Sequence, residues 1–217
     1  MKGDIAMLDE MIQSLVKRHS HGRTMIGIDG LGGSGKTSLV HRIHGDLLTG
    51  PRQTVLIHLD DHIVPSCYRY GTGRPQWQEY YELQWDVVGL KHTLFDLLTS
   101  PSLLFHVPFY DKHSDSIIQK QLDVEEDAVV LVEGVFLQRP EWIEYFDVVI
   151  FVDCPFHTRK GRVTSRDGYL GDEATILKIY ETRYWPAEDY YMDTIRPKEQ
   201  ATICYRQNEW REYPCDN

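Results

Sequence analysis

Short, continuous apolar runs recur along this chain, and segments with apolar residues at helical intervals lie between them. Continuous apolar runs are typical of strands that are buried on both faces of a parallel sheet. They predict strands at residues 24–29, 54–59, 128–132, 146–152 and 202–205. Helical spacing predicts helices at residues 4–18, 36–48, 86–98, 156–166 and 173–183. Strands that alternate with helices indicate an α/β fold with a mostly parallel five-stranded sheet.

Two stretches depart from this alternation. Residues 65–84 are rich in Tyr, Trp, Arg and Gly, and we interpret them as a mobile loop or lid segment outside the core. Residues 103–107 predict a further short strand. The amphipathic segment 4–18 predicts an N-terminal helix that packs on the core, with a partner-binding helix as the alternative. The length of 217 residues suits one large domain or one domain with an inserted lobe, so residues 1–217 are predicted to form a single domain.

Composition and charge narrow the possible partners. The 217 residues include 33 acidic and 23 basic ones, for a formal net charge of −10. Such a chain offers no broad basic face, so we expect no nucleic-acid partner. No apolar run approaches the roughly 20 residues that span a bilayer, and no export signal is visible, so we expect a cytoplasmic protein without membrane association. The sequence leaves the oligomeric state open.

The cysteines argue against two kinds of site. The chain contains Cys67, Cys154, Cys204 and Cys215, and none of them forms a C-x-x-C pair. Neither a zinc site nor a redox dithiol is therefore indicated.

The first predicted strand leads into Gly30-Leu31-Gly32-Gly33-Ser34-Gly35-Lys36-Thr37, here called the phosphate loop. It matches the pattern G-x-x-x-x-G-K-[ST] at every fixed position, between a predicted strand and a predicted helix. Glycines let backbone N–H groups turn toward a phosphate, and the helix N-terminus adds positive potential. We predict a nucleoside triphosphate, with Lys36 on the outer phosphates and the Thr37 hydroxyl on Mg²⁺; a chance glycine-rich turn is the alternative. The predicted nucleotide-binding residues are Gly30, Gly32, Gly33, Ser34, Gly35, Lys36, Thr37 and Ser38.

Acidic residues follow the other predicted strands. Asp60 and Asp61 follow the second strand, and Glu133 follows the strand at 128–132. Ligands of parallel α/β sheets bind at the carboxyl ends of the strands, where these groups converge. Phosphoryl transfer to a hydroxyl needs a carboxylate base and Mg²⁺, so we assign Asp60 or Asp61 as the base and Glu133 as a metal ligand through water. The alternatives are a turn or helix cap for the aspartates and a cap or ion pair for Glu133. Asp153 is interpreted as structural.

Arg159, Arg162 and Arg166 recur at helical spacing on one face of a predicted helix. A solvated stripe is one interpretation. We favour a lid that closes over the triphosphate, because arginines there stabilise the negative charge of the transition state and exclude water.

Together these segments resemble the uridine kinase branch of the P-loop small-molecule kinases, which is related to phosphoribulokinase, pantothenate kinase and nicotinamide riboside kinase. The resemblance runs from about residue 24 to residue 205. Its motifs, in family order, are the phosphate loop, His58-Leu59-Asp60-Asp61-His62, Pro108-Phe109-Tyr110-Asp111-Lys112-His113, Val132-Glu133-Gly134-Val135, the arginine segment from His157 to Asp167, and Tyr184-Trp185-Pro186-Ala187.

The resemblance implies a P-loop NTPase fold, a three-layer α/β/α sandwich with an acceptor-binding insert at about 62–102 and a lid at about 159–172. It implies that Asp60 is the catalytic base, that Arg159 and Arg166 clamp the transferring phosphoryl group, and that ATP and Mg²⁺ are used. A nucleoside 5′-hydroxyl is the first acceptor expected, ahead of pantothenate, nicotinamide riboside or a sugar phosphate. The acceptor-binding residues expected are Asp61, Trp77, Tyr81, Tyr110, His113 and Arg162.

The acceptor side departs from the family pattern. Leu83 stands where spacing places the aspartate that holds the ribose in uridine kinases, and Ile63 stands where a tyrosine is usual. His113 lies a residue or two earlier than its counterpart. A nucleotide-binding regulatory module is the alternative outside enzymes, although a GTPase-like switch is disfavoured because the chain has no N-K-x-D motif.

Overall fold

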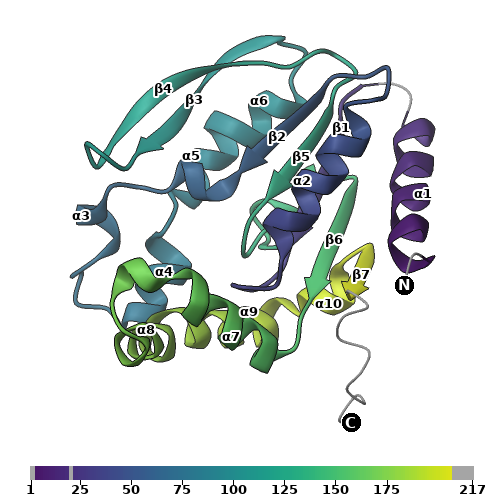
Figure 1. Cartoon of the computed structure of the whole chain (residues 1–217). Coiled ribbons are helices and arrows are strands. Elements are labelled where there is room, and N and C mark those ends of the chain that lie inside the picture. The colour runs from purple at the N-terminus through teal and green to yellow at the C-terminus, as the bar shows by residue number, and fades with distance from the viewer. Residues whose placement is uncertain (1–2, 20–21, 207–217) are drawn as a thin grey trace.

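A computed structural model describes residues 3–19 and 22–206 of the chain. Its centre is a parallel sheet of five strands in the order β2-β5-β1-β6-β7 (Figure 1). The strands are β1 (Thr24–Asp29), β2 (Thr54–His58), β5 (Val129–Glu133), β6 (Val148–Asp153) and β7 (Ile203–Arg206). The predicted α/β fold with a parallel five-stranded sheet is confirmed.

Helices cover both faces of the sheet. On one face lie α1 (Gly3–Arg18) and α2 (Lys36–Leu47), whose Leu8, Leu39 and Ile43 pack against Ile26 and Ile28 of β1. Met25, the neighbour of Ile26, belongs to the core of the opposite face, because successive strand residues point to opposite sides. The predicted N-terminal helix therefore packs on the core.

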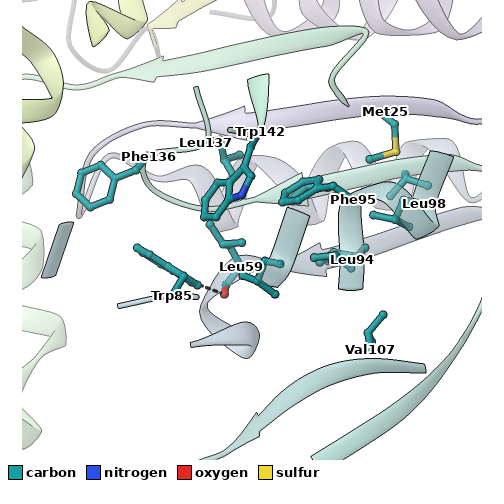
Figure 2. Close-up of a cluster of buried hydrophobic side chains, with 14 of the residues drawn as sticks. Met25, Leu59, Trp85, Leu94, Phe95, Leu98, Val107, Phe136, Leu137 and Trp142 are labelled. Carbon is teal, nitrogen blue, oxygen red and sulfur yellow. Dashed lines mark hydrogen bonds between the residues drawn. The ribbon is translucent and has the colours of Figure 1, made fainter. Parts of the chain in front are cut away.

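The core of the second face is large and aromatic. It is built around a continuous helix, α5 (Val87–Leu90), the π turn η2 (Lys91–Phe95) and α6 (Asp96–Thr99), as the spacing predicted. Figure 2 shows Trp85, Phe95, Phe136 and Trp142 gathered there, and each is at most 2% exposed. The indole of Trp85 donates a hydrogen bond of 2.9 Å to the carbonyl oxygen of Leu59.

Residues 65–84 are not the loop outside the core that their composition suggested. They contain α3 (Ser66–Arg69) and α4 (Gln76–Leu83). Tyr80 and Tyr81 of α4 pack edge-on against Phe136 at 5.4 and 5.0 Å between ring centroids. The prediction was wrong because tyrosines were taken for loop residues, whereas here they bury their rings on one face of a short helix.

The segment after residue 98 also differs from the prediction. Instead of one short strand, it forms an antiparallel hairpin of β3 (Leu104–Asp111) and β4 (Ser116–Asp123), seen at the upper left of Figure 1. The sequence pattern missed β4 because most of its residues are exposed and polar, so the strand carries no buried face.

The last helices gather at the carboxyl end of the sheet, toward which the β6 arrow points in Figure 1. They are α7 (Phe156–Arg166), the 3₁₀ turn η4 (Gly168–Leu170), α8 (Glu173–Ile179), α9 (Trp185–Ile195) and α10 (Pro197–Gln200). The helix predicted to end at residue 183 continues into α9 through the π turn η5 (Tyr180–Tyr184). A π turn accommodates Pro186, which lacks an N–H and would crowd the preceding turn of a regular helix.

Candidate functional site

The phosphate loop connects β1 to α2 at the carboxyl edge of the sheet. Gly33 and Gly35 have φ angles of +75° and +98°, which residues with a Cβ rarely adopt. Gly35 precedes α2 without giving it a side-chain cap, and no acidic residue lies in its first turn, so this helix end is suited to an anion. Lys36 is 7% exposed, and its ammonium group donates a hydrogen bond of 3.1 Å to the Leu31 carbonyl oxygen. The buried Ser34 hydroxyl has no hydrogen-bond partner among the described residues.

A cavity of about 910 Å³ lies between this loop and α7. It brings together most of the predicted nucleotide-binding residues with two of the three predicted lid arginines. Its lining comprises Gly33, Gly35, Lys36, Thr37, Ser38, His157, Thr158, Gly161, Arg162, Ser165 and Arg166. A polyphosphate fits this cavity chemically, because its walls supply a helix N-terminus, one ammonium and two guanidinium groups.

Glu133 links the loop to the second strand. Its Oε1 accepts a hydrogen bond of 3.3 Å from the Thr37 hydroxyl, and its Oε2 lies 2.9 Å from Nδ1 of His58. Burial alone would raise the pKa of Glu133, but the His58 hydrogen bond and the Lys36 charge outweigh it and lower this pKa. The same hydrogen bond raises the pKa of His58, against the opposing effect of burial. The hydroxyl and the ionised carboxylate are oxygen ligands of the kind that Mg²⁺ prefers.

Asp60 lies in the 3₁₀ turn η1 (Leu59–His62), directly after β2, with Asp61 beside it. The Asp60 side chain reaches solvent, yet the protein packed around it raises its pKa, and the Glu133 and Asp61 carboxylates act in the same direction. The Lys36 and Arg166 charges oppose this shift. Because like-charged neighbours reinforce burial, the raised pKa does not depend on burial alone.

The three arginines of α7 that were predicted to form a lid have different surroundings. Arg159 is 6% exposed and donates from Nη1 to Glu188 Oε2 at 2.6 Å and to the Gly32 carbonyl at 3.2 Å. Arg162 Nη1 donates to the carbonyls of Gly33 and Ser34 at 3.3 and 3.2 Å. Arg166 pairs with Asp167, and its side chain is 62% exposed. Arg162 and Arg166 thus line the cavity, whereas Arg159 is held behind the loop.

The six predicted acceptor residues are spread over four parts of the fold: Asp61 lies in η1, Arg162 in α7, and the other four in α4 and the β3–β4 hairpin. In α4, Trp77 and Tyr81 pack on Tyr190 of α9, with ring centroids 5.2 and 5.0 Å away. On the hairpin, the Tyr110 hydroxyl donates to Asp115 at 2.9 Å. His113 sits in the turn of the same hairpin, where its side chain is 87% exposed. The structure therefore does not gather these four side chains into one contact cluster.

A second cavity, of about 720 Å³, lies beside η1. Two of the residues that depart from the family pattern, Ile63 and Leu83, line it together with His62, Pro108 and Ile117. Two carboxylates, Glu82 and Asp86, line it as well. The cavity is thus mainly apolar but not without acidic groups, although Leu83 itself offers none.

Some residues of this region were missed by the sequence analysis. Glu188 follows the Trp185-Pro186-Ala187 segment and is 2% exposed, and burial raises its pKa while Arg159 and the Gly32 N–H oppose the shift. Arg69 donates to the hydroxyls of Tyr70 and Tyr110 at 2.9 and 3.2 Å. The sequence offers one signal for Glu188, its charge on the otherwise buried face of a helix. Such a charge does not by itself indicate a contact with the phosphate loop.

The contacts of Asp153 are consistent with the predicted structural role. It forms ion pairs with Lys198, at 2.7 Å, and with Arg206. Burial would raise the pKa of Asp153, but these two cations outweigh it and lower this pKa.

Cys67, Cys154 and Cys204 are free, and Cys215 lies outside the described residues. Across residues 3–19 and 22–206, no group of three His, Cys, Asp or Glu side chains could hold a metal, and no helix is long and apolar enough to cross a membrane.

The parallel sheet, the phosphate loop and the facing arginines define a P-loop protein of the kinase type. No family model matches the sequence. A uridine kinase of Macrococcus caseolyticus is 26% identical over 185 residues, which cover 81% of this chain and 88% of that protein. A solved structure described as a possible uridine kinase from Bacillus stearothermophilus is 36% identical, with a TM-score of 0.76 over 93% of this chain and 97% of that one.

A D-glycerate 3-kinase from Cryptococcus neoformans var. grubii shares the fold at 14% identity, with a TM-score of 0.63 over 95% of each chain. At the identity and coverage of the Bacillus structure, this chain belongs to the uridine kinase-like P-loop kinases. It is a kinase of the type that phosphorylates a hydroxyl group of a small molecule.

Proposed function

We propose that this protein transfers the γ-phosphoryl group of ATP to a hydroxyl of a small molecule, with a nucleoside 5′-hydroxyl as the first candidate. The observation that carries the proposal is the setting of Asp60. This carboxyl lies within electrostatic reach of Lys36, Glu133 and Arg166, which come from three other elements. The names of the Macrococcus and Bacillus relatives support uridine as the leading acceptor.

The phosphate loop and α7 would bind the triphosphate from two sides. Lys36 would leave the Leu31 carbonyl, to which it now donates, and neutralise the outer phosphates. Arg162 and Arg166 would contribute positive charge from α7, on the opposite wall of the cavity. Fixed cations at the transferring group stabilise the charge that spreads over its oxygens in the transition state.

Thr37 and Glu133 would hold Mg²⁺, Glu133 through water. The bound ion would neutralise phosphate charge and orient the phosphates. His58 keeps the Glu133 carboxylate ionised and oriented through the 2.9 Å contact to Oε2. A partner of this kind fixes a metal-binding carboxylate in place.

Asp60 would accept the proton of the attacking hydroxyl at a carboxylate oxygen. The raised pKa of Asp60 makes its carboxylate a stronger base than an ordinary surface aspartate. Asp61 would assist by orienting the acceptor from the same turn.

The 720 Å³ cavity beside η1 is the candidate site for the body of the acceptor. Its apolar wall suits a flat or hydrophobic moiety, and the Glu82 and Asp86 carboxylates could accept hydrogen bonds from acceptor hydroxyls. Pantothenate, nicotinamide riboside or a sugar phosphate are the alternative acceptors. A nucleotide-binding regulatory module without transfer activity is the alternative outside enzymes.

A coupled ADP-release assay with Mg·ATP tests the proposal. The acceptors would be uridine, cytidine, nicotinamide riboside, pantothenate and ribulose 5-phosphate. Release stimulated by uridine or cytidine supports the nucleoside kinase, and stimulation by another acceptor alone retains the transfer chemistry and overturns the nucleoside. ATP binding without stimulated release by any acceptor favours the regulatory module.

A further inference from the structure

Glu188 of α9 contacts the phosphate loop but is not among the residues that line the nucleotide cavity. Its Oε1 accepts a hydrogen bond of 2.6 Å from the backbone N–H of Gly32. Its Oε2 accepts one of 2.6 Å from Arg159, whose same Nη1 donates to the Gly32 carbonyl at 3.2 Å. The carboxylate and the guanidinium thereby hold the N–H and the C=O of one loop residue.

Glycines at positions 32 and 33 leave room for Glu188 and Arg159 to approach the loop. A Cβ on Gly32 would lie 2.9 Å from Glu188 Oε1, and a Cβ on Gly33 would lie 2.9 Å from the Arg159 carbonyl. Both distances are too short for a side chain, so glycines here serve the contact with α7 and α9 as well as the approach of a phosphate. The ion pair ties three separate elements together at the loop.

Arg159 and Glu188 are both buried, so the loss of either partner would be costly. The side chains of Arg159 and Glu188 are 8% and 3% exposed. A buried carboxylate needs both its charge partner and its hydrogen bonds, and the loss of one partner leaves an uncompensated group. Arg159 Nε is buried without a hydrogen-bond partner among the described residues, which leaves the Nη1 contact with Glu188 the more important for its charge.

We propose that Glu188 is a positioning residue for the nucleotide: through Gly32 and Arg159 it holds the phosphate loop in the conformation that binds the triphosphate. This role rests on the proposed ATP-dependent function. Glu188 is not among the cavity-lining residues, and its two carboxylate oxygens are bonded to Gly32 and Arg159, so the proposed role is exerted through the loop. The loop conformation would otherwise have to be ordered by the nucleotide at the expense of affinity.

Equilibrium binding of Mg·ATP without acceptor, measured by calorimetry together with Tm, tests the role in Glu188→Gln. A glutamine cannot accept hydrogen bonds at both ends, so we expect the Kd for ATP to rise about tenfold. Glu79→Gln is the matched control, because Glu79 and Arg183 form a second buried pair, with side chains each 4% exposed, in the α4–η5 region. It should lower Tm and leave the Kd within about twofold of wild type.

A wild-type Kd in Glu188→Gln, with Tm lowered as in Glu79→Gln, would show a structural role only and overturn the proposal. If Glu188→Gln does not fold, Glu188→Asp replaces it, because aspartate keeps the charge but is too short to reach both partners. A rise of about tenfold in the Kd for Mg·ATP would support the proposal, and an unchanged Kd would overturn it. Wild-type protein that binds no Mg·ATP would overturn the proposed function itself, an outcome distinct from intact binding in the variant.

Discussion

The indole N–H of Trp85 donates a hydrogen bond of 2.9 Å to the carbonyl oxygen of Leu59, the residue directly before Asp60 (Figure 2). Trp85 is 2% exposed and Leu59 is fully buried. The aromatic core therefore determines where the turn η1 leaves β2, and with it the position of the proposed base. The packing of Trp85 in the buried core is in this way connected to the position of Asp60 at the edge of the sheet.

Trp85→Phe should lower both stability and turnover. The change leaves a buried carbonyl without its donor, which costs about 1–3 kcal/mol, and it loosens the turn that carries Asp60. We expect kcat to fall about threefold to tenfold, because misplacement of a catalytic group slows the chemistry. Denaturant unfolding and steady-state kinetics measure the two effects.

Trp142→Phe is the control, since the Trp142 indole donates to the Val87 carbonyl at 3.0 Å in the same core. It should lose similar stability and keep its kcat. Equal losses of kcat in both variants would contradict the link between Trp85 and Asp60.

Asp60→Asn should lower kcat by about 100-fold or more and leave ATP affinity near normal, the result expected when a general base is lost. Asp61→Asn, one residue along the same turn, should retain far more activity. Steady-state kinetics and ATP binding distinguish the effects. Turnover of Asp60→Asn equal to that of wild type would refute the assignment of the base.

Glu133→Gln should raise the Mg²⁺ concentration needed for half-maximal activity by about tenfold or more, because the ionised ligand held by His58 is replaced by a neutral amide. A Mg²⁺ titration at fixed ATP measures it. Thr37→Ser, which keeps the hydroxyl, is the control. An unchanged Mg²⁺ requirement in Glu133→Gln would contradict a role of the Glu133 carboxylate in Mg²⁺ binding.

The activity should fall in acid with a midpoint above the ordinary aspartate pKa of 3.8. Asp60 must be ionised to accept a proton, so kcat/KM should rise with pH through the raised pKa of Asp60 and then level off. Asp61→Asn removes a negative neighbour that raises this pKa, so the acid limb should move to lower pH. A limb that stays in place or moves to higher pH would contradict this origin.

The sequence predicted much of this fold because the central strands β1, β5 and β6 are short apolar runs buried on both faces and the helices keep their spacing. It also predicted the phosphate loop, because Lys36, Thr37 and the glycines are contiguous and each is needed for local backbone reasons. The converging carboxylates Asp60 and Glu133 followed from the rule that ligands bind at the carboxyl ends of parallel strands.

Only the tertiary structure decided which side chains meet. Glu188 is 156 positions from Gly32 in the chain, and no local pattern connects them. The three arginines of α7 look alike in sequence, yet Arg159 is buried in an ion pair while Arg166 lines the cavity. The helix α4 and the strand β4 were hidden because their stability comes from tertiary packing and pairing. Local pattern thus determined most of the helices and strands, whereas long-range burial and charge pairing determined α4, β4 and the site that the elements form.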